Sequence, residues 1–181
     1  MSLQLLQQKL PEVKVWIDRT LATHAGQSRP VLSLGFPRLS AYYSAELLAS
    51  ARAIPVAEVP IPPLASMGLV GFDEFENLDA AGITYLSSYF VRLDHESVES
   101  LHFHELVHVV QWQHLGPERF IMAYALGHLL SGGYRSNPLE DQAYSLQARF
   151  DRQDPPFDVA ALVRPGLDRV VPSLFQAAGL G

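Results

Sequence analysis

A histidine–glutamate–histidine pattern is the clearest chemical feature of this sequence. His104-Glu105-Leu106-Val107-His108 forms an HExxH motif, and seven histidines and ten glutamates in 181 residues would produce this pattern by chance only about 0.015 times. Residues four positions apart share one face of an α-helix, so the two imidazoles can bind a single cation. Glu105 lies slightly to the side, where it can accept a proton from a metal-bound water without binding the metal.

The amino-acid composition limits the metal and its ligands. The chain contains no cysteine, which excludes disulfides, thiolate zinc sites, iron–sulfur clusters and cysteine nucleophiles. A metal must therefore be held by histidine, aspartate or glutamate. Zinc suits such a set, because it lowers the pKa of a bound water toward about 7 and polarises a carbonyl group. The motif thus predicts a zinc site with Glu105 as the general base.

The third zinc ligand has two candidates of different type, the first of which is His114. It follows His108 by six residues, as in the metzincin pattern HExxHxxGxxH, and Met122 could serve as the later methionine of that pattern. However, Gln111 occupies the position of the glycine that allows the chain to turn. If the helix continues to Leu115, His114 lies about 240° around the helix from His108 and faces away from the metal.

The other candidate is Glu140, in the segment Asn137–Tyr144 (NPLEDQAY). This glutamate is expected in the first turn of a later helix, where the helix dipole also favours acidic residues. Two histidines and one glutamate form an established catalytic zinc set with an open fourth position. Ligand chemistry therefore favours Glu140, while Asp141 and His114 stay open as alternatives.

The two segments HELVHVVQW and NPLEDQAY resemble the gluzincin-type HExxH zinc metallopeptidase family. Its small members carry an HELxHVxQ helix and a later Pro-x-Glu-x-x-Ala helix. The resemblance covers about Leu101–Arg149, roughly a quarter of the chain. It implies that His104 and His108 are zinc ligands, that Glu105 is the catalytic base, and that Glu140 is the third ligand.

Further polar residues are candidates by position alone. Hydrolytic zinc sites often add a donor for the developing oxyanion, and the possible donors here are Tyr124, His128, Tyr134, Arg135 and Tyr144. Ordinary packing or exposure is the competing interpretation for each. His102 lies about 200° around the helix from His104, so it should not bind the same ion. His24 and His95 are expected at the surface.

The N-terminal half is expected to combine helices with short strands. Pro11 should break or kink a helix over Leu3–His24. Four prolines in Ala53–Leu64 exclude a central strand and predict an edge strand or an extended loop. Ile83–Leu93 is rich in β-branched and aromatic residues and is the clearest strand. The remaining expectations are a strand at Val31–Phe36, a helix at Ser40–Arg52 capped by Ser40, and a loop at Gly68–Gly82.

The C-terminal half is expected to be helical. Asp94 should cap the HExxH helix, which ends at Leu115 before Gly116-Pro117. Further helices are expected at Glu118–Leu130, at Pro138–Phe150, and in one or two pieces around Val159–Val163 and Leu167–Ala178. A mixed half followed by a helical half predicts one α+β domain over residues 1–181. The family resemblance implies a zincin-like fold, with a small mixed or antiparallel sheet in the N-terminal half.

Charge and hydropathy exclude other partners. The net charge is −6, from 19 acidic and 13 basic residues, and the arginines are scattered, so no nucleic-acid footprint is expected. No window approaches the roughly 18 apolar residues of a membrane span, and the first residues do not resemble a signal peptide. The sequence therefore predicts a soluble cytoplasmic protein and leaves its oligomeric state open.

The functional prediction is a zinc-dependent hydrolase, in particular a peptidase acting on peptides or proteins. The Ile83–Leu93 strand precedes the metal helix and could pair with an extended substrate through main-chain hydrogen bonds. The alternative is a non-catalytic protein that keeps the fold for a structural or partner-binding role. The presence of Glu105 favours the enzyme, because a degenerate scaffold often loses the base.

Overall fold

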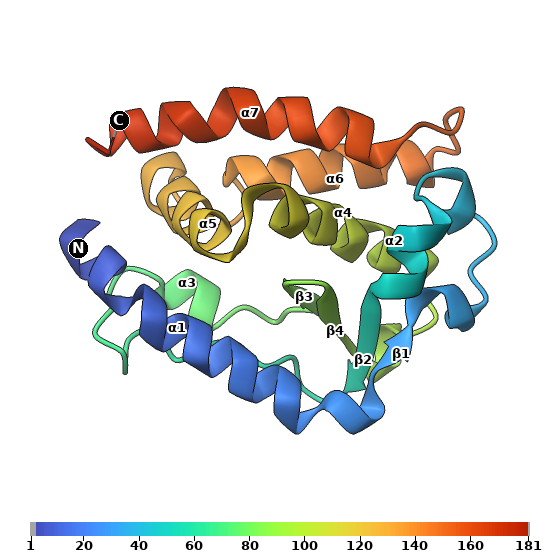
Figure 1. Cartoon of the computed structure of the whole chain (residues 1–181), viewed down its shortest axis with the longest axis horizontal. Helices are drawn as coiled ribbons and strands as arrows, with labels where there is room; N and C mark the ends of the chain where they lie inside the picture. The colour runs from blue at the N-terminus through green and yellow to red at the C-terminus, as the bar shows by residue number, and fades with distance from the viewer. Residues whose placement is uncertain (1–2, 181) are drawn as a thin grey trace.

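The computed structural model describes residues 3–180 and shows a mixed α+β architecture (Figure 1). Within this range it contains seven α-helices and a four-stranded sheet. The expected domain over residues 1–181 includes residues 1, 2 and 181, which lie outside the described range. Helices α4 to α7 form the upper part of the molecule in Figure 1, and the sheet and α1 lie below them.

The sheet is mixed and has the strand order β1-β2-β4-β3. Its strands are β1 (Arg29–Pro30), β2 (Arg52–Val56), β3 (Gly82–Tyr85) and β4 (Ser88–Arg92). The central pair, β2 and β4, is parallel, and β1 and β3 flank it in antiparallel orientation. Strand β3 is therefore an edge strand.

The single strand predicted at Ile83–Leu93 is wrong, because this stretch folds into the hairpin of β3 and β4. The strands meet through a tight turn at Leu86 and Ser87, and Leu86 takes the left-handed conformation, with φ of 60°. Hairpin turns of this kind usually contain glycine or asparagine, which mark the turn in the sequence. Neither is present here, so the β-branched and aromatic composition on both sides of the turn is typical of a single strand.

The prediction of an edge strand or loop at Ala53–Leu64 is wrong for Ala53–Val56, because β2 lies between β1 and β4, whereas residues 57–64 form no strand. The backbone N–H of Arg52 donates to Ser87, on the β4 side. Because alternate residues point to opposite neighbours, Pro55 faces the other side. There β1 pairs only with Arg52 and Ala53, so Pro55 lies beyond its end and costs no ladder hydrogen bond.

The N-terminal helices differ in detail from the expected ones. Helix α1 (Leu3–Thr23) runs through Pro11 without a break. Helix α2 (Ala45–Ser50) begins five residues after the expected start, with Ser44 rather than Ser40 as its N-cap. The apolar run expected as a strand forms a 3-10 helix at Val31–Leu34, and the expected loop contains the single-turn helix α3 (Asp73–Glu76).

The C-terminal helices follow the sequence prediction closely. They are α4 (Glu99–Leu115), α5 (Pro117–Ser131), α6 (Pro138–Asp151) and α7 (Val159–Ala177), the last a single helix despite two internal prolines. The expected cap at Asp94 is wrong, since α4 begins at Glu99. The Asp94 carboxylate instead accepts a hydrogen bond from Arg92, at 2.7 Å. Asp94 lies within a 3-10 turn at Leu93–His95, and the N-cap position of α4 falls on Val98.

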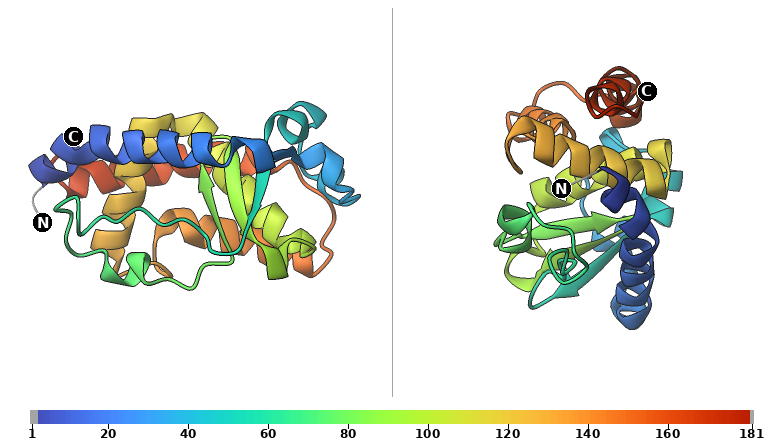
Figure 2. Two further views of the ribbon diagram at one scale, coloured as in Figure 1. Left: turned by 90° about the horizontal axis from the view of Figure 1, so that it is seen from below. Right: turned by 90° about the vertical axis from the view of Figure 1, so that its left-hand side faces the viewer.

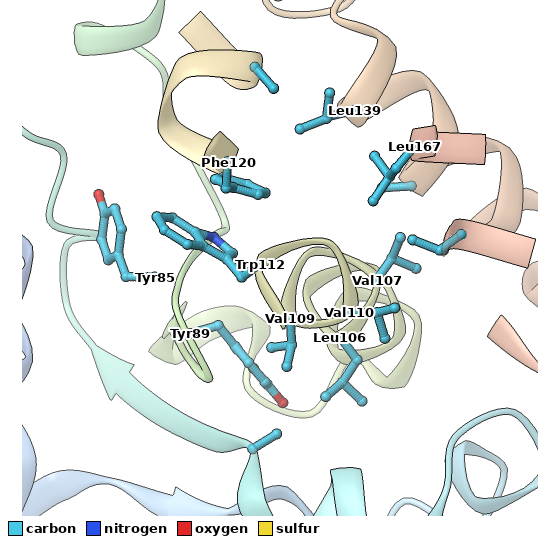
Figure 3. Packing of buried hydrophobic residues seen from close by; sticks show 14 of the residues in the cluster. Tyr85, Tyr89, Leu106, Val107, Val109, Val110, Trp112, Phe120, Leu139 and Leu167 are labelled. Atoms are coloured by element: carbon cyan, nitrogen blue, oxygen red, sulfur yellow. The ribbon is translucent and has the colours of Figure 1, made fainter. Parts of the chain in front are cut away.

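Helix α4 is the centre of the hydrophobic core. Its residues Leu106, Val107, Val109 and Val110 are fully buried and point in different directions around the helix axis (Figure 3). A helix that is apolar on all sides is packed on all sides. The motif-bearing helix is therefore held between the sheet and the helices α5, α6 and α7. No helix in residues 3–180 has the length and apolar character needed to cross a membrane.

Candidate metal centre

Three buried side chains from two helices converge beside the sheet. His104 and His108 come from α4, and Glu140 comes from the first turn of α6. The two histidine Nε2 atoms are 3.1 Å apart, and each lies 3.4 Å from one oxygen of the Glu140 carboxylate. All three residues are at most 5% exposed. The structure thus brings the three favoured ligands close enough to bind one metal ion.

The start of α6 is fixed by polar contacts that place Glu140. The Asn137 side chain caps α6 by accepting a hydrogen bond from the Leu139 N–H, and it donates to the Tyr124 carbonyl on α5. A side chain at Gly127 would collide with Asn137, so this glycine lets α5 and the α6 cap approach closely. Pro138 then starts the helix in a direction that carries Glu140 toward α4.

Two glutamines orient the imidazoles. Gln147 Oε1 lies 3.0 Å from Nδ1 of His104, and Gln111 Oε1 lies 2.8 Å from Nδ1 of His108. A glutamine oxygen only accepts hydrogen bonds, so each Nδ1 must donate, which leaves Nε2 of a neutral ring as an acceptor. Both Nε2 lone pairs therefore face Glu140. Histidine metal ligands typically donate their other ring N–H to such an acceptor, which fixes the tautomer and the ring orientation.

Gln111 also joins the two ligand-bearing helices. Its Nε2 donates to the Leu139 carbonyl and to the Gln142 side chain on α6, both at 3.0 Å. In the sequence, Gln111 stands out only as the residue in place of a glycine, and Gln147 carries no signal of its role. The i, i+3 spacing of His108 and Gln111 on a helix was a signal that could have found the first of these roles.

The polar atoms of this cluster fit a cation. Glu140 Oε1 accepts a hydrogen bond from the Tyr124 hydroxyl at 2.6 Å, whereas Oε2 has no hydrogen-bond partner in the described part of the chain. Two imidazole acceptors and a buried carboxylate repel one another unless a positive charge lies between them. The donor set of two nitrogens and one carboxylate is one that metal ions bind.

Without a metal, a proton supplies that charge. Burial lowers the pKa of His108, but the neighbouring Glu140 carboxylate outweighs this effect and raises the pKa to about 9. Burial raises the pKa of the Glu140 carboxyl. The charges of His108 and His104 outweigh this effect and hold the pKa well below the usual range. A metal ion entering the cluster must displace the His108 proton.

The two alternative third ligands lie elsewhere. Helix α4 continues through Gln111 to Leu115, and Nε2 of His114 contacts Asp168 on α7 at 2.7 Å. Asp141 is exposed to solvent. Neither residue belongs to the cluster that the structure forms from His104, His108 and Glu140.

The remaining histidines have structural partners. His102 is buried, and its two ring nitrogens contact the Tyr89 hydroxyl at 2.6 Å and the Glu96 carbonyl at 2.9 Å. His24 and His95 are half-buried rather than fully at the surface. The ring of His24 packs edge-on against Phe90, and His95 contacts Asp94.

Glu105 lies against the edge strand β3. Its carboxylate accepts a hydrogen bond from the Thr84 hydroxyl at 2.6 Å. A Cβ at Gly82 would lie 2.5 Å from the other carboxylate oxygen, so only glycine allows the strand to come this close. Burial raises the pKa of Glu105, while His104, His108 and the Thr84 hydrogen bond oppose the rise. A carboxylate with a raised pKa accepts protons more readily near neutral pH.

The possible oxyanion donors differ in their surroundings. The Tyr124 hydroxyl is bound to Glu140, and burial is the main cause of its raised pKa. Tyr134 lines the cavity beside Glu140, and its hydroxyl lies 3.3 Å from that of Tyr144. Tyr144 also packs on His104, with 4.5 Å between the ring centroids. Tyr124 and Tyr134 both line the cavity, but only the Tyr124 hydroxyl is bound to Glu140, whereas that of Tyr134 pairs with Tyr144.

The other two possible donors do not line that cavity. Arg135 is exposed, with its guanidinium over the Tyr144 ring. His128 is buried against Phe72, and its Nδ1 has no hydrogen-bond partner in the described residues. Both side chains are held by packing outside the cavity.

An apolar cavity of about 110 Å³ adjoins the cluster, and we refer to it as the chamber. The cluster and Glu105 form its polar end. Its other walls come from α1, from the segment between β2 and β3, from β3 and from α5. The segment between β2 and β3 runs alongside α1, as Figure 2 shows. The chamber is not predictable from the sequence, because its apolar lining residues have the same pattern as ordinary core residues.

Comparison with known proteins does not assign the chain to a family. No family model, no curated protein and no solved structure matches it.

Proposed function

We propose that this protein is a zinc-dependent hydrolase, most directly a peptidase, with zinc held by His104, His108 and Glu140. One observation carries the proposal: the buried side chains of His104, His108 and Glu140 converge from two helices, with ligand atoms that all lie within 4.8 Å of one another. Two histidines and one glutamate are a catalytic zinc set with an open fourth position. A zinc ion there supplies a Lewis acid and lowers the pKa of a coordinated water.

The residues of this chain divide the remaining work. Glu105 takes the proton from the attacking water and returns it to the leaving amine, which is general base and then general acid catalysis. Thr84 holds the Glu105 carboxylate in place through its hydroxyl. Gln111 and Gln147 keep both imidazoles in the metal-binding tautomer. Tyr134 is the donor we assign to the oxyanion, because it lines the chamber and its hydroxyl, unlike that of Tyr124, is not bound to Glu140.

The position of β3 supports a peptide substrate. It is an edge strand, and its Gly82 end lies against Glu105. An extended peptide paired with this edge would bring a carbonyl group close to the base. The combination of an HExxH helix, an adjacent edge strand and a later glutamate helix also supports a zincin-like fold.

The first experiment compares metal content and turnover. Zinc-reconstituted protein is expected to bind one zinc per chain and to cleave members of a broad peptide library. Glu105→Gln should keep the zinc but lower the cleavage rate at least about 100-fold, because an amide cannot accept the proton. Glu99→Gln changes the other glutamate of α4, which faces Arg38, and serves as the matched control.

Each readout can contradict a separate part of the proposal. Folded protein without stoichiometric zinc would refute the metal site. Zinc-loaded protein that cleaves nothing in the library would favour the non-catalytic alternative. Near-normal turnover by Glu105→Gln would remove this residue from the mechanism.

A further inference from the structure

The free edge of β3 offers few main-chain groups. The Ala81 carbonyl accepts a hydrogen bond from the Arg92 N–H, so this residue faces β4. Because neighbouring residues of a strand point their N–H and C=O groups to opposite sides, Gly82 and Thr84 face away from β4. The Thr84 carbonyl is already occupied, since it accepts a hydrogen bond from Nε1 of Trp112 at 3.1 Å. An incoming peptide can therefore make a complete pair of hydrogen bonds only with Gly82.

Trp112 is held firmly at this position. It is 4% exposed and stacks on Phe120, with 4.0 Å between ring centroids and 17° between ring planes. Figure 3 shows its ring leaving α4 toward Phe120 and Tyr85. A buried, stacked ring of this size does not move aside without losing packing. Trp112 thus closes the edge of β3 at Thr84.

The chamber limits the side chain that can be bound. Apart from the cluster, Glu105, Thr84 and the tyrosine hydroxyls, its walls are aliphatic and aromatic, including Leu6, Val13 and Ile17 of α1. A charged group buried among these apolar walls would be desolvated without a partner, at a high cost. Its volume of about 110 Å³ is somewhat smaller than the roughly 150 Å³ of an apolar cavity known to bind benzene. One isobutyl or phenyl group fills such a space, and a long chain does not fit.

We propose that the substrate is a short peptide with one uncharged apolar side chain, of isobutyl to phenyl size, which enters the chamber. Its main chain pairs with Gly82 alone, and Trp112 prevents pairing beyond this residue. The proposal rests on the proposed function, because it places the scissile bond beside Glu105. It assigns Trp112 as the residue that sets substrate length and the chamber as the determinant of side-chain choice.

The side-chain part is tested by calorimetric titration of zinc-loaded protein with N-acetyl hydroxamates of leucine, glycine and lysine. The leucine compound should bind about 100-fold more tightly than the glycine compound, because it adds four buried carbons. The lysine compound should bind no more tightly than the glycine compound. Equal binding of the leucine and glycine compounds, or a preference for lysine, would overturn the proposal.

Two neighbouring alanines provide a matched pair of variants. Ala80 lines the chamber, whereas Ala81 does not, and both are half-buried. Ala80→Phe should fill part of the chamber and reduce the preference for leucine over glycine to about fivefold or less. Ala81→Phe should keep the preference of the wild type. The same loss in both variants would place the side chain outside the chamber.

The length part is tested with leucine ligands extended by one and two residues at either end. In the wild type, residues that would pair with Thr84 should improve binding less than about threefold. Trp112→Phe removes the N–H but keeps a ring for Phe120, so there the same extension should gain about tenfold from the freed carbonyl. The unextended ligand reports whether the variant site is intact. An equal gain in the wild type and the variant would refute the role of Trp112.

Failure of the proposed function can be told apart from failure of this inference. If the protein binds no zinc, the proposed function fails, and the chamber is then tested by titrating toluene into metal-free protein. Saturable toluene binding that Ala80→Phe abolishes and Ala81→Phe preserves would support the chamber as an apolar side-chain site. No saturable binding would overturn the inference. If zinc binds but the hydroxamates do not distinguish side chains, only the inference fails.

Discussion

The metal cluster and the chamber are adjacent, yet they are built in opposite ways. The cluster lies between α4 and α6 and is held by directional hydrogen bonds through Gln111, Gln147 and Tyr124. The chamber lies between α1, the segment before β3 and α5, and its walls meet through apolar contacts. The cluster forms the polar end of the chamber, but Gln111 and Gln147 do not line it, so we expect the metal affinity and the side-chain preference to be changeable separately.

The largest effect short of removing a ligand is expected at Gln111. Gln111→Ala should weaken zinc binding about 10- to 100-fold, because His108 loses the acceptor that fixes its tautomer and α6 loses a link to α4. Gln113→Ala, at an exposed position of the same helix, is the control and should leave zinc affinity unchanged. Competition with a chelator measures both values. Equal affinities would show that the glutamine network does not support the metal.

A smaller loss of zinc affinity is expected at Gln147. Its oxygen accepts from His104, and its Nε2 makes only a long contact of 3.5 Å to Ser100. Gln147→Ala should therefore weaken zinc binding about tenfold, less than Gln111→Ala, in the same chelator assay. The reverse order would mean that His104, rather than the bridge between α4 and α6, controls the geometry of the cluster.

The pH dependence of stability should separate metal-free from zinc-loaded protein. The pKa of His108 rises from about 6.5 in the unfolded chain to about 9 in the folded, metal-free protein. A raised pKa stabilises the folded state below pH 6.5, and this contribution is lost as the pH rises through 9. The change is on the order of 1–3 kcal/mol. Thermal melting between pH 6 and 9.5 measures it.

Zinc should reverse this trend, because it binds the neutral imidazole and competes with the proton. The zinc-loaded protein is therefore expected to gain stability relative to the metal-free protein as the pH rises over the same interval. A metal-free melting temperature that does not fall toward pH 9 would contradict the coupling between His108 and Glu140.

The smallest effect is expected on the zinc affinity of a variant in which only the chamber is changed. Ala80→Phe fills part of the chamber but touches none of the hydrogen bonds of the cluster, so zinc affinity should stay within about twofold of the wild-type value. The chelator assay again provides the measurement. A large loss would show that the two regions are coupled, and the comparison drawn above would then be wrong.

The helices that carry the site were predictable, and the walls around it were not. Local signals marked α4, α5 and α6: the HExxH spacing, Gly116-Pro117 and Pro138. The turn at Leu86 carries no glycine or asparagine, so the β3–β4 hairpin was read as one strand. The role of Gly82 depends on the approach of β3 to Glu105, which no local pattern encodes. Residues such as Val13 and Ile17 line the chamber, yet their spacing matches any core-facing helix.

The central claim is that Glu140, rather than His114, completes the metal site. The most direct measurement is zinc titration of Glu140→Ala and His114→Ala against a competing chelator. Glu140→Ala should lose more than about 100-fold in zinc affinity, whereas His114→Ala should keep the wild-type value, since His114 contacts Asp168 on α7. A larger loss for His114→Ala, or no loss for Glu140→Ala, would contradict the site described here.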